Sequence, residues 1–229
     1  MSEVKKRFDG IILAAGLSMR MNEWKPEVKI NGIPIIIHSI NSMMPHCENI
    51  IVVGGFNFSE LKYLIEKYSS SFNGRKGTVS VVENKNYLSG MLSSVKCGLN
   101  QIDQTADGIF ILPGDMPFVS IQTYFNLVLQ FSDENFDVFL PAVVLKSPTM
   151  NNGELFKKGH PVLIKSKIIQ KILDDETEVI FRNILKKYRQ KICLVEDEGI
   201  NLDIDNDSDF KKAESYFEKF ILKKEALNE

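Results

Sequence analysis

The feature that most constrains this chain is a short apolar segment near its N-terminus that runs straight into a turn of small residues. Residues 8–13 end in Ile-Ile-Leu and predict a buried β-strand. The Ala-Ala-Gly turn that follows leaves the backbone bare, so its N–H groups can approach an anion or a planar ring. Arg20 and Lys25 then add two cations. The segment predicts a phosphate-binding loop; the alternative is a plain strand-to-helix turn with two solvated cations.

Two well-known phosphate-binding motifs are absent from this position. The loop lacks the G-x-x-x-x-G-K-[ST] pattern of a P-loop and the G-x-G-x-x-G pattern of dinucleotide-binding folds. What remains is L-A-A-G-x-S-x-R-M with a lysine five residues after the arginine. This resembles the signature loop of nucleotidyltransferases with a Rossmann-like fold, most closely the molybdenum cofactor cytidylyltransferases. The resemblance implies a loop that holds the triphosphate and base of an incoming nucleotide.

Short apolar segments alternate with helical patterns along the whole chain. This alternation predicts βαβ units and a mainly parallel sheet covered on both faces. With the resemblance, it leads us to expect a Rossmann-like three-layer α/β/α nucleotidyltransferase fold, formed as a single domain over residues 1–229. Strands are predicted at residues 8–13, 49–53, 78–82, 108–112, 137–143 and 192–195. Helices are predicted at 34–44, from a Ser59 N-cap, at 90–99, from a Ser120 N-cap, and at 166–173, 178–188 and 208–223, with a loop at 146–158.

Composition narrows the class of partner. The net charge of -2 argues against nucleic acid, because neutralising a phosphate backbone requires a surplus of Lys and Arg, so we expect a small substrate. Cys47, Cys97 and Cys193 are scattered without metal-ligand spacing and predict reduced cytosolic thiols. The polar N-terminus predicts neither a signal peptide nor a membrane span. We therefore expect a cytoplasmic protein.

A carboxylate follows the fourth predicted strand, in the sequence Gly114-Asp115-Met116-Pro117. Ligands bind beyond the carboxyl ends of strands in open α/β sheets, and Mg²⁺ favours one or two carboxylates together with substrate phosphates. The segment also resembles the metal-binding motif of the family. Asp115 is thus predicted to hold Mg²⁺; the alternative is a turn residue that bonds its own backbone.

Two further acids, Asp203 and Asp205, stand two residues apart in a stretch that reads as extended. On a strand they would point the same way and repel one another unless a cation lay between them. The stretch resembles the D-I-D core of a C-terminal family motif, which implies that one of the pair is a second metal ligand. The alternative is that both acids favour the N-terminus of the following helix.

The remaining motifs resemble the nucleotide and acceptor sites of the family. The predicted nucleotide-binding set is Leu13, Ala14, Ala15, Gly16, Arg20, Lys25, Asn84, Gly90, Ser93, Ser94 and Gly114, where the serines could instead simply cap a helix. The predicted acceptor-binding set is Gly159, His160, Pro161 and Arg182, although the spacing and missing glycines around Arg182 depart from the family pattern.

These motifs lead to one expected reaction, with Arg20, Lys25 and Asp115 as its catalytic residues. A phosphate oxygen of the acceptor attacks the α-phosphorus of CTP and pyrophosphate leaves, with Mg²⁺ as cofactor. Ala15 favours CTP over GTP by resemblance, and the implied acceptor is molybdopterin, for delivery to a molybdenum hydroxylase. The alternatives are a transferase for another acceptor, such as a sugar phosphate or an alcohol phosphate, and a non-catalytic nucleotide sensor.

Overall fold

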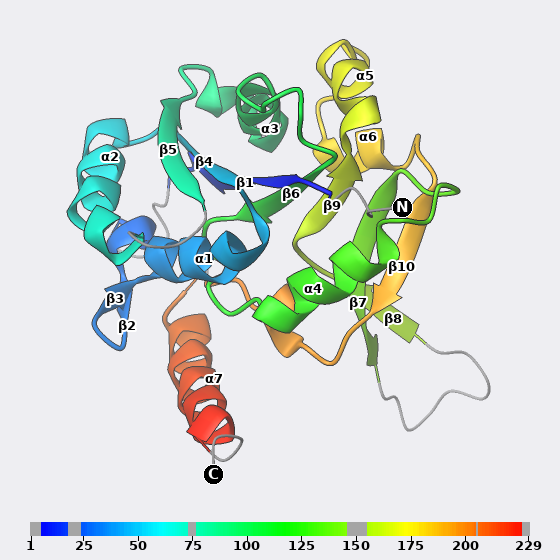
Figure 1. Cartoon of the computed structure of the whole chain (residues 1–229). Coiled ribbons are helices and arrows are strands. Elements are labelled where there is room, and N and C mark those ends of the chain that lie inside the picture. Colours follow the sequence, from blue (N-terminus) through cyan, green and yellow to red (C-terminus); the bar gives the residue numbers. More distant parts are fainter. Residues whose placement is uncertain (1–5, 18–23, 73–76, 146–154, 205, 226–229) are drawn as a thin grey trace.

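The computed structural model describes residues 6–17, 24–72, 77–145, 155–204 and 206–225, with the backbone alone at 207 and 218–225. It shows a mixed sheet with helices on both faces (Figure 1). The strands are β1 (Phe8–Ala14), β2 (Lys29–Ile30), β3 (Ile33–Pro34), β4 (Asn49–Gly54), β5 (Thr78–Glu83), β6 (Gly108–Pro113), β7 (Val138–Leu145), β8 (Leu155–Lys158), β9 (Val162–Lys165) and β10 (Gln190–Leu194). The helices are α1 (Ile35–Met43), α2 (Phe58–Lys67), α3 (Met91–Leu99), α4 (Ile121–Gln130), α5 (Ile169–Leu173), α6 (Phe181–Leu185) and α7 (Asp207–Glu225).

The main sheet has the order β10-β7-β9-β6-β1-β4-β5, with β8 paired to β7. Its central strands β6, β1, β4 and β5 run parallel, while β9 is antiparallel to both of its neighbours. The prediction of a mainly parallel sheet is confirmed. The loop predicted for residues 146–158 is wrong at its end, because Leu155–Lys158 forms β8 and pairs antiparallel with β7.

Successive residues of the central strands point to opposite faces of the sheet, and each face carries its own core. On one face, Ile12 packs in a cluster with residues of α1, α2 and α4. On the other, Ile11 packs in a cluster with residues of α3, α5 and α6. Burial on both faces explains why these strands are continuously apolar. The expected three-layer α/β/α fold is confirmed.

Two predicted helices differ from the observed ones at their ends. Ser59 does not cap α2: the N-cap is Asn57, which has a left-handed backbone, and Ser59 lies inside the helix. The helix predicted over residues 178–188 is shortened to α6, since the chain before Phe181 is irregular. The prediction for α4 is confirmed, because the Ser120 side chain accepts a hydrogen bond from the Gln122 N–H.

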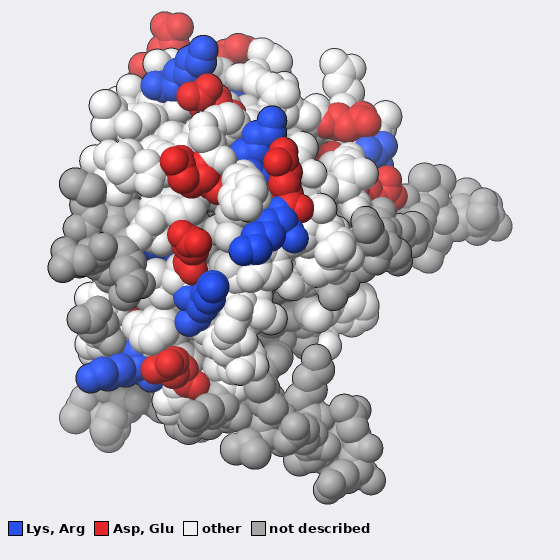
Figure 2. Space-filling view, turned by 90° about the vertical axis from the view of Figure 1, so that its left-hand side faces the viewer, with Lys and Arg blue, Asp and Glu red and all other residues white. Residues whose placement is uncertain are grey.

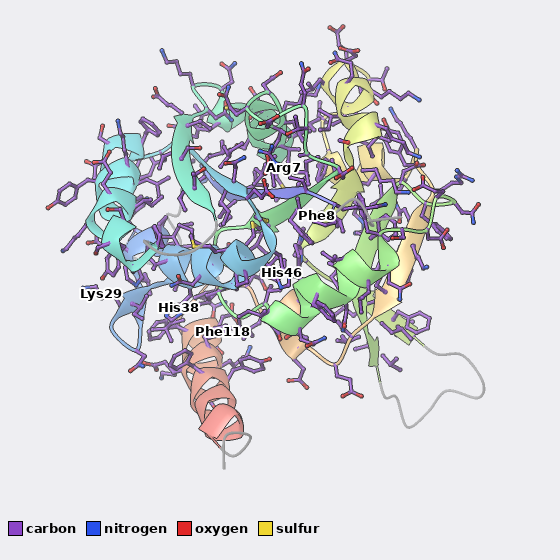
Figure 3. The ribbon with its side chains drawn as sticks, viewed as in Figure 1. Arg7, Phe8, Lys29, His38, His46 and Phe118 are labelled. Carbon is purple, nitrogen blue, oxygen red and sulfur yellow. The ribbon has the colours of Figure 1, made fainter. Side chains whose placement is uncertain are left out.

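The helix α7 and the short β2–β3 hairpin form a small subassembly at the base of the molecule (Figure 1). His38 and Phe118, labelled in Figure 3, lie where α7 meets the body of the protein, and both rings contact Phe217. Ile30 and Ala213 are buried in the same cluster. The apolar spacing predicted for the last helix therefore joins it to the rest of the fold.

The surface near α2 and β5 carries both signs of charge. Among the described residues on this face, Lys and Arg side chains alternate with Asp and Glu, and neither sign forms a broad patch (Figure 2). The described part of this face therefore lacks the basic footprint of a nucleic-acid-binding surface. None of the helices within the described ranges combines the length and the apolar character that crossing a bilayer requires.

Candidate active site

A cavity of about 310 Å³ opens at the carboxyl ends of β1 and β6, which pair in parallel at the centre of the sheet. This is the edge at which open α/β sheets bind ligands. Most residues of the predicted nucleotide-binding set line it, namely Leu13, Ala14, Ala15, Gly16, Lys25, Gly90, Ser94 and Gly114, together with Asp115. Residues 18–23, and with them Arg20, lie outside the described residues.

The turn after β1 is held from both sides by neighbouring backbone. The Gly114 N–H donates to the Leu13 carbonyl at 2.9 Å, and the Phe56 N–H donates to the Ala15 carbonyl at 3.3 Å. A side chain at Gly114 would meet the Leu13 carbonyl oxygen at 3.1 Å, which explains the small residue there. The bare turn is therefore fixed in the position that the sequence predicts for a phosphate-binding loop.

Lys25 is buried rather than solvated. It begins a short 3-10 turn (Lys25–Glu27), and its side chain is 10% exposed. Its Nζ lies 3.4 Å from Oδ2 of Asp115, whose side chain is 30% exposed. A buried ammonium beside a partly open carboxylate acts more strongly than surface charges do, because little water screens it. This arrangement favours the phosphate-binding interpretation over a solvated surface cation.

The segment that precedes α7 contacts the backbone of Asp115. The Ile204 N–H donates to the Asp115 carbonyl at 3.2 Å, so the neighbouring Asp203 lies near the Asp115 loop, with its own side chain exposed. Residues 202–204 belong to no strand, so the argument that Asp203 and Asp205 share a strand face does not apply. Asp205 lies outside the described residues.

Side-chain hydrogen bonds of Asn84 stabilise the turn between Asn84 and Ser94. The Asn84 amide donates to Ser93 Oγ at 2.8 Å and to Ser94 Oγ at 3.0 Å, and its Oδ1 accepts from the Asn86 N–H. Ser93 Oγ is also within hydrogen-bond distance of the Gly90 carbonyl. Asn84 and Ser93 do not line the cavity, so they shape the turn, whereas Gly90 and Ser94 face the cavity.

Three of the predicted acceptor residues, Gly159, His160 and Pro161, lie beside this cavity rather than in its lining. Gly159 and His160 precede β9, which pairs with β6, and the His160 N–H donates to the Ile200 carbonyl at 2.9 Å. A side chain at Gly159 would meet the Ile200 carbonyl oxygen at 2.2 Å, so only glycine fits. Pro161 is buried after a cis peptide bond. Arg182 does not line the cavity and is exposed on α6.

The His160 ring is largely enclosed. Burial lowers the pKa of its imidazole, so the ring is neutral near pH 7. Its Nδ1 is buried with no hydrogen-bond partner among the described residues. A neutral imidazole has less affinity for a phosphate dianion than an imidazolium would have.

Sequence reasoning missed several lining residues, namely Pro26, Ile35, Tyr87, Met91 and Pro113. Three of them, Pro26, Met91 and Pro113, adjoin a residue that was predicted, so proximity in the chain was the available signal. Ile35, the first residue of α1, adjoins none of the predicted residues. Tyr87 is different, because it lies three residues before Gly90 and enters the lining through the turn that Asn84 braces. Its place depends on tertiary packing.

Asp197 is a buried acid outside the cavity, and its hydrogen bonds hold together the segments that lie next to the Asp115 loop. Asp197 accepts hydrogen bonds from the Ser120 N–H at 2.9 Å, the Gly199 N–H at 3.0 Å and the Thr123 and Tyr216 hydroxyls. Burial, with the Asp197 charge nearby, raises the pKa of Tyr216 to about 12, so this phenol remains a donor. Asp197 thereby links β10, α4 and α7 beneath the Asp115 loop.

Replacing Asp197 should destabilise the fold. In Asp197→Ala, two backbone N–H groups and two hydroxyls lose a charged acceptor, and we expect a loss of about 3 kcal/mol in the free energy of unfolding, measured by urea denaturation. Glu196→Ala is the matched control, because Glu196 is exposed, and it should stay within about 0.5 kcal/mol of the wild type. Equal midpoints for the two variants would contradict this role of Asp197.

Comparison with known proteins gives a family match and a curated relative that each cover most of the chain. Residues 10–192 match the sequence profile of the MobA-like NTP transferase domain. The chain is 28% identical over 209 residues to the molybdenum cofactor cytidylyltransferase of Escherichia coli, covering 91% of this chain and 96% of that protein.

Two solved structures share the fold. 4-Diphosphocytidyl-2C-methyl-D-erythritol synthase from Anaerococcus prevotii has a TM-score of 0.68 at 18% identity, covering 93% of this chain and 96% of that one. CMP:2-keto-3-deoxy-manno-octonic acid synthetase in complex with CTP has a TM-score of 0.70 at 12% identity, covering 93% and 99%. At these identities the similarity concerns the fold alone.

Proposed function

Because the chain belongs to the MobA-like NTP transferase domain family and is a nucleotidyltransferase, we propose that it transfers CMP from CTP to the phosphate of molybdopterin, releasing pyrophosphate. The observation that carries the proposal is the buried Lys25 ammonium, 3.4 Å from the Asp115 carboxylate, at the mouth of a bare glycine turn. The profile match confirms the family resemblance expected from the L-A-A-G motif. The identity of base and acceptor rests on the Escherichia coli relative and on Ala15.

In this proposal, positioning and charge stabilisation supply most of the catalysis. The backbone N–H groups of the turn at Ala14, Ala15 and Gly16 orient the triphosphate. Lys25 and Arg20 neutralise the charge that develops as the bond between the α- and β-phosphates breaks. The attacking group is a phosphate oxygen of the acceptor, which is already ionised near neutral pH, so no side chain has to remove a proton.

The residues at the cavity fit a magnesium ion held jointly with the substrate. Among the described residues there is no cluster of three His, Cys, Asp or Glu side chains that would form a complete protein cage. Mg²⁺ instead favours one or two carboxylates plus phosphate oxygens and water, which Asp115, with Asp203 or Asp205 as a second ligand, would supply. When bound, the ion would neutralise phosphate charge and template the in-line geometry.

The acceptor would approach from the β9 side, where Gly159, His160 and Pro161 lie, with Arg182 as a more distant candidate. A sugar phosphate or an alcohol phosphate is the alternative acceptor, because one fold can serve different acceptors. The proposal also implies a cytoplasmic reaction whose product is delivered to a molybdenum hydroxylase. An acceptor screen that measures pyrophosphate release from CTP and Mg²⁺ separates molybdopterin from the other phosphates.

A nucleotide melting screen tests the base. At a CTP concentration of about 100 Kd with Mg²⁺, binding should add about 2.7 kcal/mol to stability and raise the Tm by roughly 5–10 °C. GTP should raise the Tm less, and EDTA should remove most of the CTP effect, because the ion and the triphosphate bind together. A larger shift with GTP than with CTP would overturn the base assignment, and a CTP shift that EDTA leaves intact would contradict the metal assignment.

A further inference from the structure

The cavity has two ends of different chemistry. Lys25 and Asp115 form the charged end, beside β6, and Tyr87 and Met91 form an uncharged end supplied by the chain after β5. The strand order β6-β1-β4-β5 places the Ala14–Gly16 turn between these two ends. If the proposed function holds, the triphosphate occupies the charged end, since the Lys25 ammonium is there, and the base occupies the end that Tyr87 lines.

Tyr87 is held in place by its own backbone. It begins the 3-10 turn Tyr87–Ser89, its N–H donates to the Asn84 carbonyl at 3.3 Å, and its carbonyl accepts from the Gly90 N–H at 3.2 Å. The Asn84 side chain braces the same turn through Asn86 and the serines of α3. These bonds fix the direction in which the tyrosine leaves the turn.

Gly55, directly after β4, packs against the Tyr87 side chain and limits its movement away from the cavity. A Cβ atom at Gly55 would lie 2.6 Å from Cβ and Cγ of Tyr87 and 2.8 Å from the Ala15 carbonyl oxygen. The root of the tyrosine side chain therefore rests directly on bare backbone, next to the turn that closes the cavity. Tyr87 therefore packs against the Gly55 backbone on one side and lines the cavity on the other, so its side chain has little freedom to move.

We propose that Tyr87 selects the base: it offers an aromatic face to a pyrimidine and leaves no room for the second ring of a purine. Aromatic side chains bind bases by stacking. The cavity, at about 310 Å³, is near the lower limit of ligand pockets, which span about 300–1,000 Å³. Gly55 contributes indirectly, because any larger residue there would push the tyrosine toward the ligand.

The test compares Tyr87→Ala with Tyr87→Phe and with Leu88→Ala, by measuring the Kd of CTP and of GTP by calorimetry with Mg²⁺. Tyr87→Ala should weaken CTP binding about tenfold and narrow the preference for CTP over GTP, because it loses the stacking face and opens space. Tyr87→Phe keeps the aromatic ring, so its CTP affinity and its preference for CTP over GTP should equal those of the wild type. Leu88 is 75% exposed and does not line the cavity, so Leu88→Ala is the neighbouring control and should match the wild type.

The outcomes separate this inference from the proposed function on which it rests. A wild-type protein that binds neither nucleotide overturns both. A wild-type protein that binds CTP tightly, together with a Tyr87→Ala variant of unchanged CTP affinity and unchanged preference, overturns only the assignment of Tyr87. Melting curves check that each variant is folded. If Tyr87→Ala is unfolded, Tyr87→Leu carries the same expectation, because it keeps an apolar contact with Gly55 and lacks the aromatic face.

Discussion

Pyrophosphate release from CTP should fall by about 10²–10³-fold in Asp115→Ala, while the fold stays intact. Among the described residues that line the cavity, Asp115 is the one carboxylate, and it lies beside the ammonium of Lys25. Its loss would remove the ligand that places a divalent cation against the phosphates. CTP binding should be partly kept, because the substitution leaves the Ala14–Gly16 turn and the uncharged end of the cavity unchanged. The measurement is steady-state pyrophosphate release, with calorimetry for CTP binding.

The matched control for this variant is Glu60→Ala, which removes an exposed acid on α2, away from the cavity. It should release pyrophosphate at the wild-type rate. A non-catalytic nucleotide sensor would not need Asp115, so the two readouts distinguish the alternatives. Wild-type turnover in Asp115→Ala would remove this residue from the mechanism. Absence of turnover in the wild type, together with tight CTP binding, would favour the sensor.

Lys25→Ala should lower kcat/KM for CTP by about 100-fold. The ammonium is buried at the charged end of the cavity, so its charge is weakly screened where the triphosphate would bind. Lys25→Arg keeps the positive charge but replaces the compact ammonium with a planar guanidinium. We therefore expect its kcat/KM to lie between those of Lys25→Ala and the wild type. The measurement is kcat/KM for CTP at saturating Mg²⁺ and acceptor, with melting curves to show that both variants are folded.

Lys29→Ala serves as the control for charge alone, because Lys29 is exposed on β2 and does not line the cavity. It removes the same charge from the same part of the chain and should leave kcat/KM unchanged. If Lys25→Ala and Lys29→Ala have the same activity as the wild type, the ammonium plays no part in phosphate binding, and the charged end must be assigned to other groups.

The sequence predicted the central sheet well because local and tertiary preferences agree there. Segments such as residues 49–53 and 108–112 are apolar and β-rich, and both faces of the sheet are buried, so no competing structure was available to them. The loop at Ala14–Gly16 and the acid at Asp115 were predicted for the same reason: each follows one of these strands directly. Their meeting at one cavity follows from β1 and β6 being neighbours.

Three details of the structure were not apparent from residue types along the sequence. Ser59 is a good N-cap by residue type, but the observed N-cap of α2 is the left-handed Asn57, two residues earlier. The strand β8 is short and exposed, and it exists only because β7 offers an edge to pair with. Asn84 was predicted to contact nucleotide, yet its amide is occupied by hydrogen bonds within its own turn.

The acceptor side was the least predictable part of the site. Gly159 and His160 are positioned by the Ile200 backbone, which approaches from a distant part of the chain. Arg182 was assigned by similarity of a motif whose spacing differs, and the short helix that carries it exposes it to solvent. Residue roles that depend on two loops meeting require the folded structure.

A crystal structure with CTP and Mn²⁺, phased by the anomalous signal of the metal, tests the central claim most directly. We predict an anomalous peak about 2.1–2.3 Å from the Asp115 carboxylate, phosphates within hydrogen-bond distance of Lys25 and the Gly16 turn, and the cytosine ring against Tyr87. A nucleotide bound elsewhere on the protein, or a metal site from which Asp115 is absent, would contradict the account.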